Sequence, residues 1–271
     1  MNTNKRPHCR PARLCIAASA LVAGLAAADE APRQDITAVP VVRSFNLVGI
    51  GAGTIPEFSG SRDQRLLILP IIRADYRDRV YINALQAGAW LWDAEDKRVR
   101  VGLAIEPRFG WEASDGTRVE GMERREFSLE GGPNVQVRTD FGVFYASVYQ
   151  DLSGASNGQS AQLQFIRAIR SSAALSPRLR LNASVGLQWL SGKTNDYYFG
   201  VRPQEARPDR PAYTAGAGTN LQAGLNGVYL MERSSILFGV VASLLGDASA
   251  DSPIVETRFQ PVVYVAYGVN F

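Results

Sequence analysis

Nine charged residues of this chain recur at every second position of alternating segments, and their types suit ion pairing. In residues 98–111 the charges occupy even positions while the odd positions are apolar or aromatic. Arginine and carboxylate side chains on one face of a strand can pair with one another or line a path for a polar solute. We expect these side chains to pair with one another and to fill the space that the strands enclose. A path for a polar solute is the alternative. The nine residues are Arg98, Arg100, Glu106, Arg108, Glu126, Glu130, Arg138, Arg178 and Arg180.

Residues 1–28 have the pattern of a secretory signal peptide. Basic residues come first, then the apolar run Leu14–Ala27, then small residues that suit a cleavage site. The apolar run is shorter than the roughly 20 residues that a membrane-spanning helix needs. We therefore expect a cleaved signal peptide over residues 1–28.

Removal of this segment excludes several kinds of chemistry. His8, Cys9 and Cys15 all lie within it, and they are the chain's one histidine and two cysteines. Disulfides, CxxC redox centres and His/Cys metal sites are then impossible in the mature protein. The segment also holds four of the 29 Lys and Arg residues and none of the 26 acidic ones, so the formal net charge falls from +3 to −1. Nucleic-acid binding thereby loses its electrostatic basis.

Catalysis has no evident machinery in the remaining sequence. A histidine base, the usual choice near neutral pH, is absent after residue 28. Asp247, Asp251 and Glu256 carry oxygen ligands for a hard cation, but their spacing matches no calcium loop, and we interpret them as solvated charges. The sequence predicts a protein that is not an enzyme and has no cofactor.

Alternation of apolar and polar residues is the pattern that predicts the fold. The segment that ends at Phe271 has apolar or aromatic residues at 263, 265, 267 and 269 and mostly small or polar residues between them. A final strand that ends in an aromatic residue resembles the signal that outer-membrane barrels present to the barrel-insertion machinery. Similar segments of about ten residues repeat along the chain, which is the length that a tilted membrane strand needs.

Two all-β architectures could use these strands. A soluble sandwich turns its apolar face inward, whereas an antiparallel transmembrane β-barrel turns it toward lipid. The signal peptide, the terminal Phe271 and the aromatic residues near strand ends favour the barrel. Eleven strands can be counted, but such barrels have even numbers. Ten strands would result if two weak segments near the N-terminus form one irregular strand, and 12 if a short strand lies near Tyr197–Val201. We predict 12 strands rather than 10, in a single β-barrel domain over 44–271 that follows a periplasmic lead-in over 29–43.

Four stretches in order resemble the MltA-interacting protein/OmpV family of outer-membrane proteins. The third of them combines Tyr197, Tyr198, Phe199, Gly200 and Val201 with a later Tyr213 and Gly216–Gly218. The other three are Gly49–Gly53 with Pro56–Ser61, Leu69–Ile72 with Tyr76–Arg77, and Gly246–Ala248 with Asp251–Val255. The resemblance implies an outer-membrane barrel of the Gram-negative cell envelope.

The resemblance also implies a role, although the family's functions are not uniform. Some members are described as scaffolds for murein synthases and lytic transglycosylases, so periplasmic murein enzymes are the expected partners, with outer-membrane lipid around the barrel. The block formed by Tyr197, Tyr198, Phe199, Gly200 and Tyr213 is expected to fold an outer loop over the barrel mouth, or to recognise a ligand. A narrow solute channel and adhesion through the outer loops are the alternatives.

Overall fold

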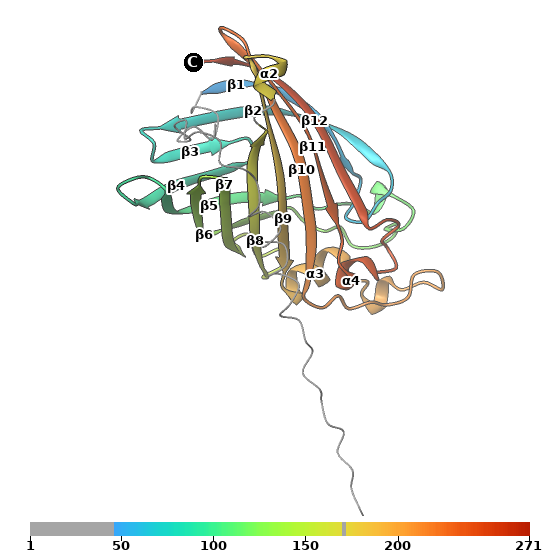
Figure 1. Ribbon diagram of the computed structural model, residues 1–271. Helices are drawn as coiled ribbons and strands as arrows, with labels where there is room; N and C mark the ends of the chain where they lie inside the picture. The colour runs from blue at the N-terminus through green and yellow to red at the C-terminus, as the bar shows by residue number, and fades with distance from the viewer. Residues whose placement is uncertain (1–45, 170–171) are drawn as a thin grey trace, which may run out of the picture. The chain divides into compact units, whose positions relative to one another are not determined.

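The computed structural model describes residues 46–169 and 172–271, which form a closed antiparallel β-barrel (Figure 1). Both the predicted signal and the lead-in lie outside the described residues. Each strand pairs with its neighbour in sequence, and β12 returns to pair with β1. The strands are β1 Leu47–Pro56, β2 Gln64–Tyr76, β3 Val80–Asn83, β4 Gln86–Asp93, β5 Val99–Arg108, β6 Ser128–Thr139, β7 Gly142–Asp151, β8 Gln159–Ile169, β9 Leu179–Leu190, β10 Gly218–Leu230, β11 Ser234–Leu244 and β12 Phe259–Asn270.

The alternation of residues along each strand divides the wall into two faces. Outward residues on β12 are exposed apolar or aromatic side chains, such as Val265 and Tyr267, which are 51% and 52% exposed. Their neighbours Ala266 and Gly268 are buried on the inner face. Because adjacent strands keep this register around the barrel, the exposed apolar residues form one belt that suits contact with lipid.

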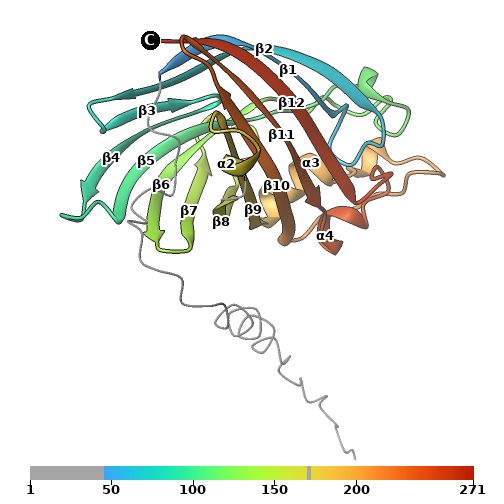
Figure 2. The same cartoon turned by 45° about the horizontal axis from the view of Figure 1, so that its top comes forward.

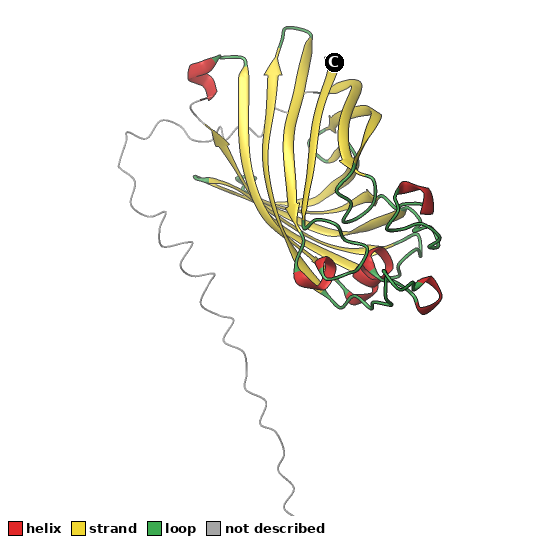
Figure 3. Ribbon diagram, turned by 90° about the vertical axis from the view of Figure 1, so that its right-hand side faces the viewer, coloured by secondary structure: helices red, strands yellow, loops and turns green. Residues whose placement is uncertain are grey.

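Short helices and turns close the two ends differently. Figure 1 places the C-terminus and α2 at one end, which we call the turn end, and α3 and α4 at the other, which we call the loop end. The same separation is visible in Figure 3. Among the described residues, no helix has the length and apolar character needed to cross a membrane. The helices are η1 Ala113–Asp115, α2 Ser172–Leu175, α3 Gly192–Phe199, η2 Pro203–Glu205 and α4 Asp247–Ala250.

The prediction of 12 strands is confirmed, but the additional strand is not where we expected it. Segment 80–92 divides into β3 and β4 around Ala84, which has a φ of 55°. Neither Ala84 nor Leu85 is a typical turn residue, so the sequence gives little sign of the hairpin. The expected short strand near Tyr197–Val201 is wrong, because most of this segment belongs to α3. Ser191 begins that helix by accepting a hydrogen bond from the Thr194 backbone N–H (3.3 Å).

The glycine repeat on β1 reflects close approach to β12. Gly49, Gly51 and Gly53 lie on the inner face, and an ideal Cβ at Gly49 would lie 2.0 Å from the Tyr267 carbonyl oxygen. A side chain there would force the two strands apart, so glycine permits the curvature of this part of the wall.

The inner face is not uniformly polar. On β2, Leu67, Leu69 and Ile71 point inward and are partly exposed, while Leu66 and Ile68 point outward. The neighbouring β1, β12 and β11 also have many small or apolar inner residues, and Figure 2 shows these strands side by side. The charged residues lie mainly on the inner face of β5 and β6 instead.

Candidate functional site

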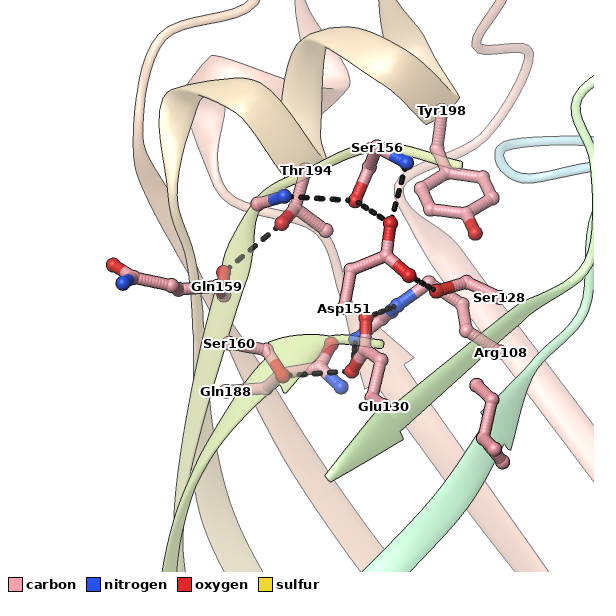
Figure 4. Close-up of polar contacts among 12 residues, drawn as sticks. Arg108, Ser128, Glu130, Asp151, Ser156, Gln159, Ser160, Gln188, Thr194 and Tyr198 are labelled. Atoms are coloured by element: carbon pink, nitrogen blue, oxygen red, sulfur yellow. Dashed lines mark hydrogen bonds and ion pairs between the residues drawn. The ribbon is translucent and has the colours of Figure 1, made fainter. Parts of the chain in front are cut away.

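A buried ion pair joins β5 and β6 on the inner face of the barrel. Arg108 Nε donates to Glu130 Oε1 (2.6 Å), and Arg108 Nη2 donates to Glu130 Oε2 (2.9 Å). The Ser160 hydroxyl of β8 donates to the same Glu130 Oε2 (2.7 Å), as Figure 4 shows. Glu130 is 2% exposed, so these contacts take the place of its water. The pair therefore fixes one side of the interior and carries no net charge.

The carboxylate of Asp151 organises the loop between β7 and β8. Its Oδ1 accepts from the Ser128 hydroxyl (2.8 Å) and the Ser153 backbone N–H (2.9 Å). Its Oδ2 accepts from the backbone N–H groups of Ser156 (2.6 Å) and Asn157 (2.9 Å). The first and third of these contacts are drawn in Figure 4. These hydrogen bonds fix the conformation of the loop, and none of them comes from a basic side chain.

A cluster of hydroxyl and amide groups lies deeper in the interior. Gln86 Nε2 donates to Glu106 Oε2 (3.0 Å) and to the Tyr145 hydroxyl (3.2 Å). The Tyr145 and Tyr149 hydroxyls are 2.9 Å apart, and Asn134 Nδ2 donates to the Tyr81 hydroxyl (2.7 Å). Most of these groups satisfy one another, so the cluster stiffens the wall and still offers polar atoms to a molecule in the lumen. We call Tyr81, Gln86, Glu106, Tyr145 and Tyr149 the tyrosine cluster.

A fourth set of polar contacts lies at the turn end. Arg100 Nε donates to Asp93 Oδ1 (2.9 Å), and Arg100 Nη1 donates to Asp78 Oδ1 (3.0 Å). The guanidinium also lies 4.7 Å from the centroid of the Trp90 ring. Lys97 pairs with the second oxygen of Asp78. Together these contacts join the β2–β3 turn to the β4–β5 hairpin.

The loop end is covered by a folded cap, which we define as residues 57–63, 109–127, 191–217 and 245–258. Two groups of buried apolar residues hold it together. One contains Phe58, Trp111, Val119, Met122, Val201 and Ile254, and the other contains Tyr198, Phe199, Ala215 and Leu245 of the cap together with Leu190, the last residue of β9. Segments far apart in the sequence therefore share a core above the barrel mouth.

A buried ion pair lies within the cap. Arg125 Nη2 donates to Glu205 Oε2 (2.9 Å), and Arg125 Nη1 donates to Glu205 Oε1 (3.0 Å). The two side chains are 1% and 3% exposed. Arg125 also donates to the carbonyl oxygens of Tyr197 (2.7 Å) and Glu123 (2.7 Å). This one side chain thus joins the β5–β6 loop to the β9–β10 loop.

The surroundings of Glu205 favour its ionised form. Burial is the largest single influence and by itself raises the pKa. Hydrogen bonds from Arg125 and from the Arg202 backbone N–H, together with the charges of both arginines, outweigh it. The pKa of Glu205 therefore lies below its ordinary value. In the same cap, burial raises the pKa of Tyr198 above its ordinary value.

The predicted lumen residues divide into two groups in the structure. Arg100, Glu106, Arg108 and Glu130 lie on the inner face in the networks described above, and Arg138 and Arg180 lie on that face nearer the turn end. Arg98, Glu126 and Arg178 each precede a strand and are exposed at its end. Arg98 approaches Asp96 (3.6 Å) and Asp140 (3.6 Å), while Glu126 pairs with Arg124.

The predicted loop motif lies in the cap. Tyr197, Tyr198 and Phe199 belong to α3, Gly200 ends that helix, and Tyr213 pairs with Val201 through a pair of backbone hydrogen bonds (2.8 and 2.9 Å). The Tyr198 ring centroid lies 5.7 Å from the Arg108 guanidinium. Phe271 follows β12 and is 72% exposed, and its backbone N–H donates to the Asn46 carbonyl oxygen (3.1 Å).

Sequence reasoning missed the Arg125–Glu205 pair and the role of Asp151. Arg125 lies in the charged run Glu123–Glu126, which resembles a solvated loop, and its partner is 80 residues away. Asp151 gives a better signal, because it ends an alternating strand and is followed by small and polar residues. Such a position favours a side chain that bonds to its own loop. Within residues 46–169 and 172–271, no group of three or more acidic, histidine or cysteine side chains is arranged to hold a metal ion.

Comparison with known proteins gives one family and several relatives. The family model described as MltA-interacting protein MipA matches residues 48–271. The outer membrane protein OmpV of Vibrio cholerae is 27% identical over 154 residues, which cover 56% of this chain and 58% of that relative. The MltA-interacting protein of Escherichia coli is 23% identical over 227 residues, which cover 83% of this chain and 89% of that relative.

These matches confirm the predicted family resemblance and the outer-membrane location. The chain spans little more than half the length of the OmpV relative that it matches. The names of these relatives describe outer-membrane or interacting proteins, and none of those names describes an enzyme.

Proposed function

Because this chain belongs to the MltA-interacting protein MipA family, we propose that it is a non-enzymatic interaction protein of the outer membrane. Its role would be to hold murein-synthesising and murein-cleaving enzymes at the membrane of the Gram-negative cell envelope. The relative from Escherichia coli, which is named for its interaction with MltA and is similar along most of its length, supports this role.

The asymmetry of the two ends is the observation that carries the proposal. In outer-membrane barrels the short turns face the periplasm and the longer loops face outward. Here the loops fold into a cap with its own apolar core and a buried ion pair. Murein enzymes work in the periplasm, so the turn end is the surface that they can reach.

The turn end offers charged contact groups. The β2–β3, β4–β5 and β6–β7 turns expose Arg77, Asp96, Arg98 and Asp140. These turns are short, so each contact area is small and the association would be weak or multivalent. Charged rims of this kind influence association rate and partner choice more than affinity.

A binding assay with a matched control tests the proposal. The full-length protein, purified from membranes and placed in nanodiscs, is titrated with a purified lytic transglycosylase and, separately, with a murein synthase. Arg77→Glu with Arg98→Glu should slow association about tenfold and weaken binding through that slower rate, whereas Arg124→Glu on the cap should leave the association rate unchanged. Absence of binding, or loss of binding through the cap variant alone, would contradict the proposal.

The two alternative functions depend on the loop end. A solute channel requires that the cap move away from the barrel mouth, and an adhesin requires that the cap contact another surface. Deleting residues 192–213 separates the three functions. The interaction role predicts unchanged binding of the murein enzymes, a channel predicts altered conductance, and an adhesin predicts lost surface attachment.

A further inference from the structure

The wall of the barrel is interrupted beside β2. The four residues of β3 pair only with Arg73–Tyr76 of β2, whereas β2 pairs with β1 from Gln64 to Arg73. Figure 1 shows β3 as a short arrow beside the long β2. Residues 64–71 of β2 thus have a paired strand on one side only. We call the interval between this part of β2 and the end of β5 the window.

The borders of the window are defined on all sides. Its floor is the β3–β4 turn, where the Ala84 backbone N–H donates to the Ile72 carbonyl oxygen (2.9 Å). Its upper border is the β5–β6 loop, from which Asp115 pairs with Arg65 of β2 (3.4 Å). Two strands separate β2 from β5, so the window is about 14 Å wide at its floor.

Proline occupies the border of the window on both strands. Since the Ile72 carbonyl faces β3, the backbone groups of Pro70, two residues earlier, face the window. On β5, the Arg98 carbonyl accepts a hydrogen bond from β6, so even-numbered residues face β6 and Pro107 faces the other side. Proline lacks the N–H that a further strand would bind, so strand addition is disfavoured at both borders.

The outer rim of the window is continuous with the lipid-facing belt. Leu66 and Ile68 are 66% and 58% exposed on β2, and Phe109 packs at an angle against the exposed Phe127 beyond β5. Behind this rim, Leu67, Leu69 and Ile71 form a partly exposed apolar strip on the inner face. An alkyl chain that leaves the lipid layer through the window would therefore meet apolar side chains first on the outer rim and then on this inner strip.

The polar groups inside the window decide which head group fits. The tyrosine cluster lies on the strands below and beside it and offers hydroxyl and amide groups. Arg108 is already paired with Glu130, and the tyrosine cluster contains the carboxyl group of Glu106 but no basic side chain. An anionic head would find no cationic partner in this cluster, whereas a hydroxyl-bearing neutral head could donate to and accept from its hydroxyl, amide and carboxyl groups.

We propose that the window admits a single-chain membrane amphiphile with a neutral, hydroxyl-bearing head. Its alkyl chain lies along Leu67, Leu69 and Ile71, and its head hydrogen-bonds to the tyrosine cluster. This site is separate from the turn end and does not depend on the proposed interaction with murein enzymes.

Photolabelling tests the site directly. The full-length protein in nanodiscs is irradiated with a monoacylglycerol that carries a diazirine in the middle of its chain, and the labelled residues are mapped by mass spectrometry. We expect labelling of Leu67, Leu69 or Ile71, and at least fivefold less with the corresponding fatty acid. Labelling confined to outward residues such as Leu66 and Ile68 would overturn the proposal. Equal labelling by the fatty acid would overturn the assignment of the head group.

A pair of matched variants completes the test. Leu69→Gln adds a polar group to the inner strip, and Leu237→Gln makes the same change on the inner face of β11, away from the window. Inner labelling should fall at least fivefold with Leu69→Gln and stay unchanged with Leu237→Gln, provided that both variants show the heat-modifiable gel mobility of a folded barrel. If a variant does not fold, the positions that are labelled in the unmodified protein decide the test. Cross-links between two copies at β2 in place of lipid labelling would identify a protein interface and overturn the proposal.

Discussion

Replacing Arg125 by alanine tests whether one buried ion pair holds the cap on the barrel. The substitution removes every donor of a guanidinium that is 1% exposed and leaves the carboxylate of Glu205 buried without its basic partner. Breaking a buried pair from one side costs about 3–5 kcal/mol. The carbonyl oxygens of Tyr197, Glu123 and Gly200 lose their donor at the same time.

The assay is hydrogen exchange measured by mass spectrometry on residues 109–127 and 191–217. Each 1.4 kcal/mol changes an equilibrium about tenfold. The expected loss therefore raises the exchange rate of the cap about a hundredfold to several-thousandfold, while the strands stay protected. Arg124→Ala is the matched control, because the adjacent arginine is exposed and pairs only with exposed carboxylates.

A double variant distinguishes loss of the pair from loss of packing. Arg125→Met combined with Glu205→Leu removes both charges and fills their volume, and such replacements are often neutral or stabilising. We expect it to recover most of the protection that Arg125→Ala loses. If Arg125→Ala exchanged at the native rate, the cap would be held by its apolar core alone and our reasoning about the pair would be refuted.

Three further predictions follow from the same contacts. The pKa of Glu205 lies below its ordinary value in the folded protein. The stability that the ionised Glu205 carboxylate contributes is therefore fully present above the unfolded pKa of about 4.3 and is lost as the pH falls through the folded pKa. Proteolysis of residues 191–217 should accelerate at that acid pH, and unchanged cleavage there would contradict the prediction. In planar bilayers the intact protein should be electrically silent because the cap closes the mouth, whereas Arg125→Ala should give brief openings; steady conductance by the intact protein would contradict the closed mouth. Arg108→Ala leaves Glu130 buried without its partner and should lower the free energy of unfolding in urea by about 3–5 kcal/mol. Arg98→Ala removes an exposed side chain and should lower that free energy by at most about 0.5 kcal/mol. Equal effects of the two substitutions would refute the distinction between the buried and the exposed site.

The strands were predictable because their signal is local. Alternation in β5 or β12 is visible within ten residues, and it places Arg100, Glu106 and Arg108 on one face without reference to the rest of the chain. The β3–β4 hairpin was missed because Asn83–Gln86 lacks the glycine or proline that usually marks a turn. On β2 both faces are apolar, so alternation there could not separate the lipid side from the interior.

The cap was beyond local reasoning for a different physical reason. Its stability depends on contacts between segments separated by many residues, such as Arg125 with Glu205 or Trp111 with Tyr198. A charged run and isolated aromatic residues in a long loop look the same in the sequence whether they are solvated or packed together. The motif from Tyr197 to Tyr213 was recognised as a unit, but its helical conformation was not.

The short β3 strand also determines how the barrel carries mechanical load. Lateral tension in a membrane pulls on every seam of a closed wall, and each seam resists through the hydrogen bonds between its two strands. Ten residue pairs join β1 to β2, whereas four join β2 to β3 and four join β3 to β4. Under the same tension these two seams bear more force per bond than any other, so rupture of the barrel would begin at β3 and not at the seam where the first and last strands meet.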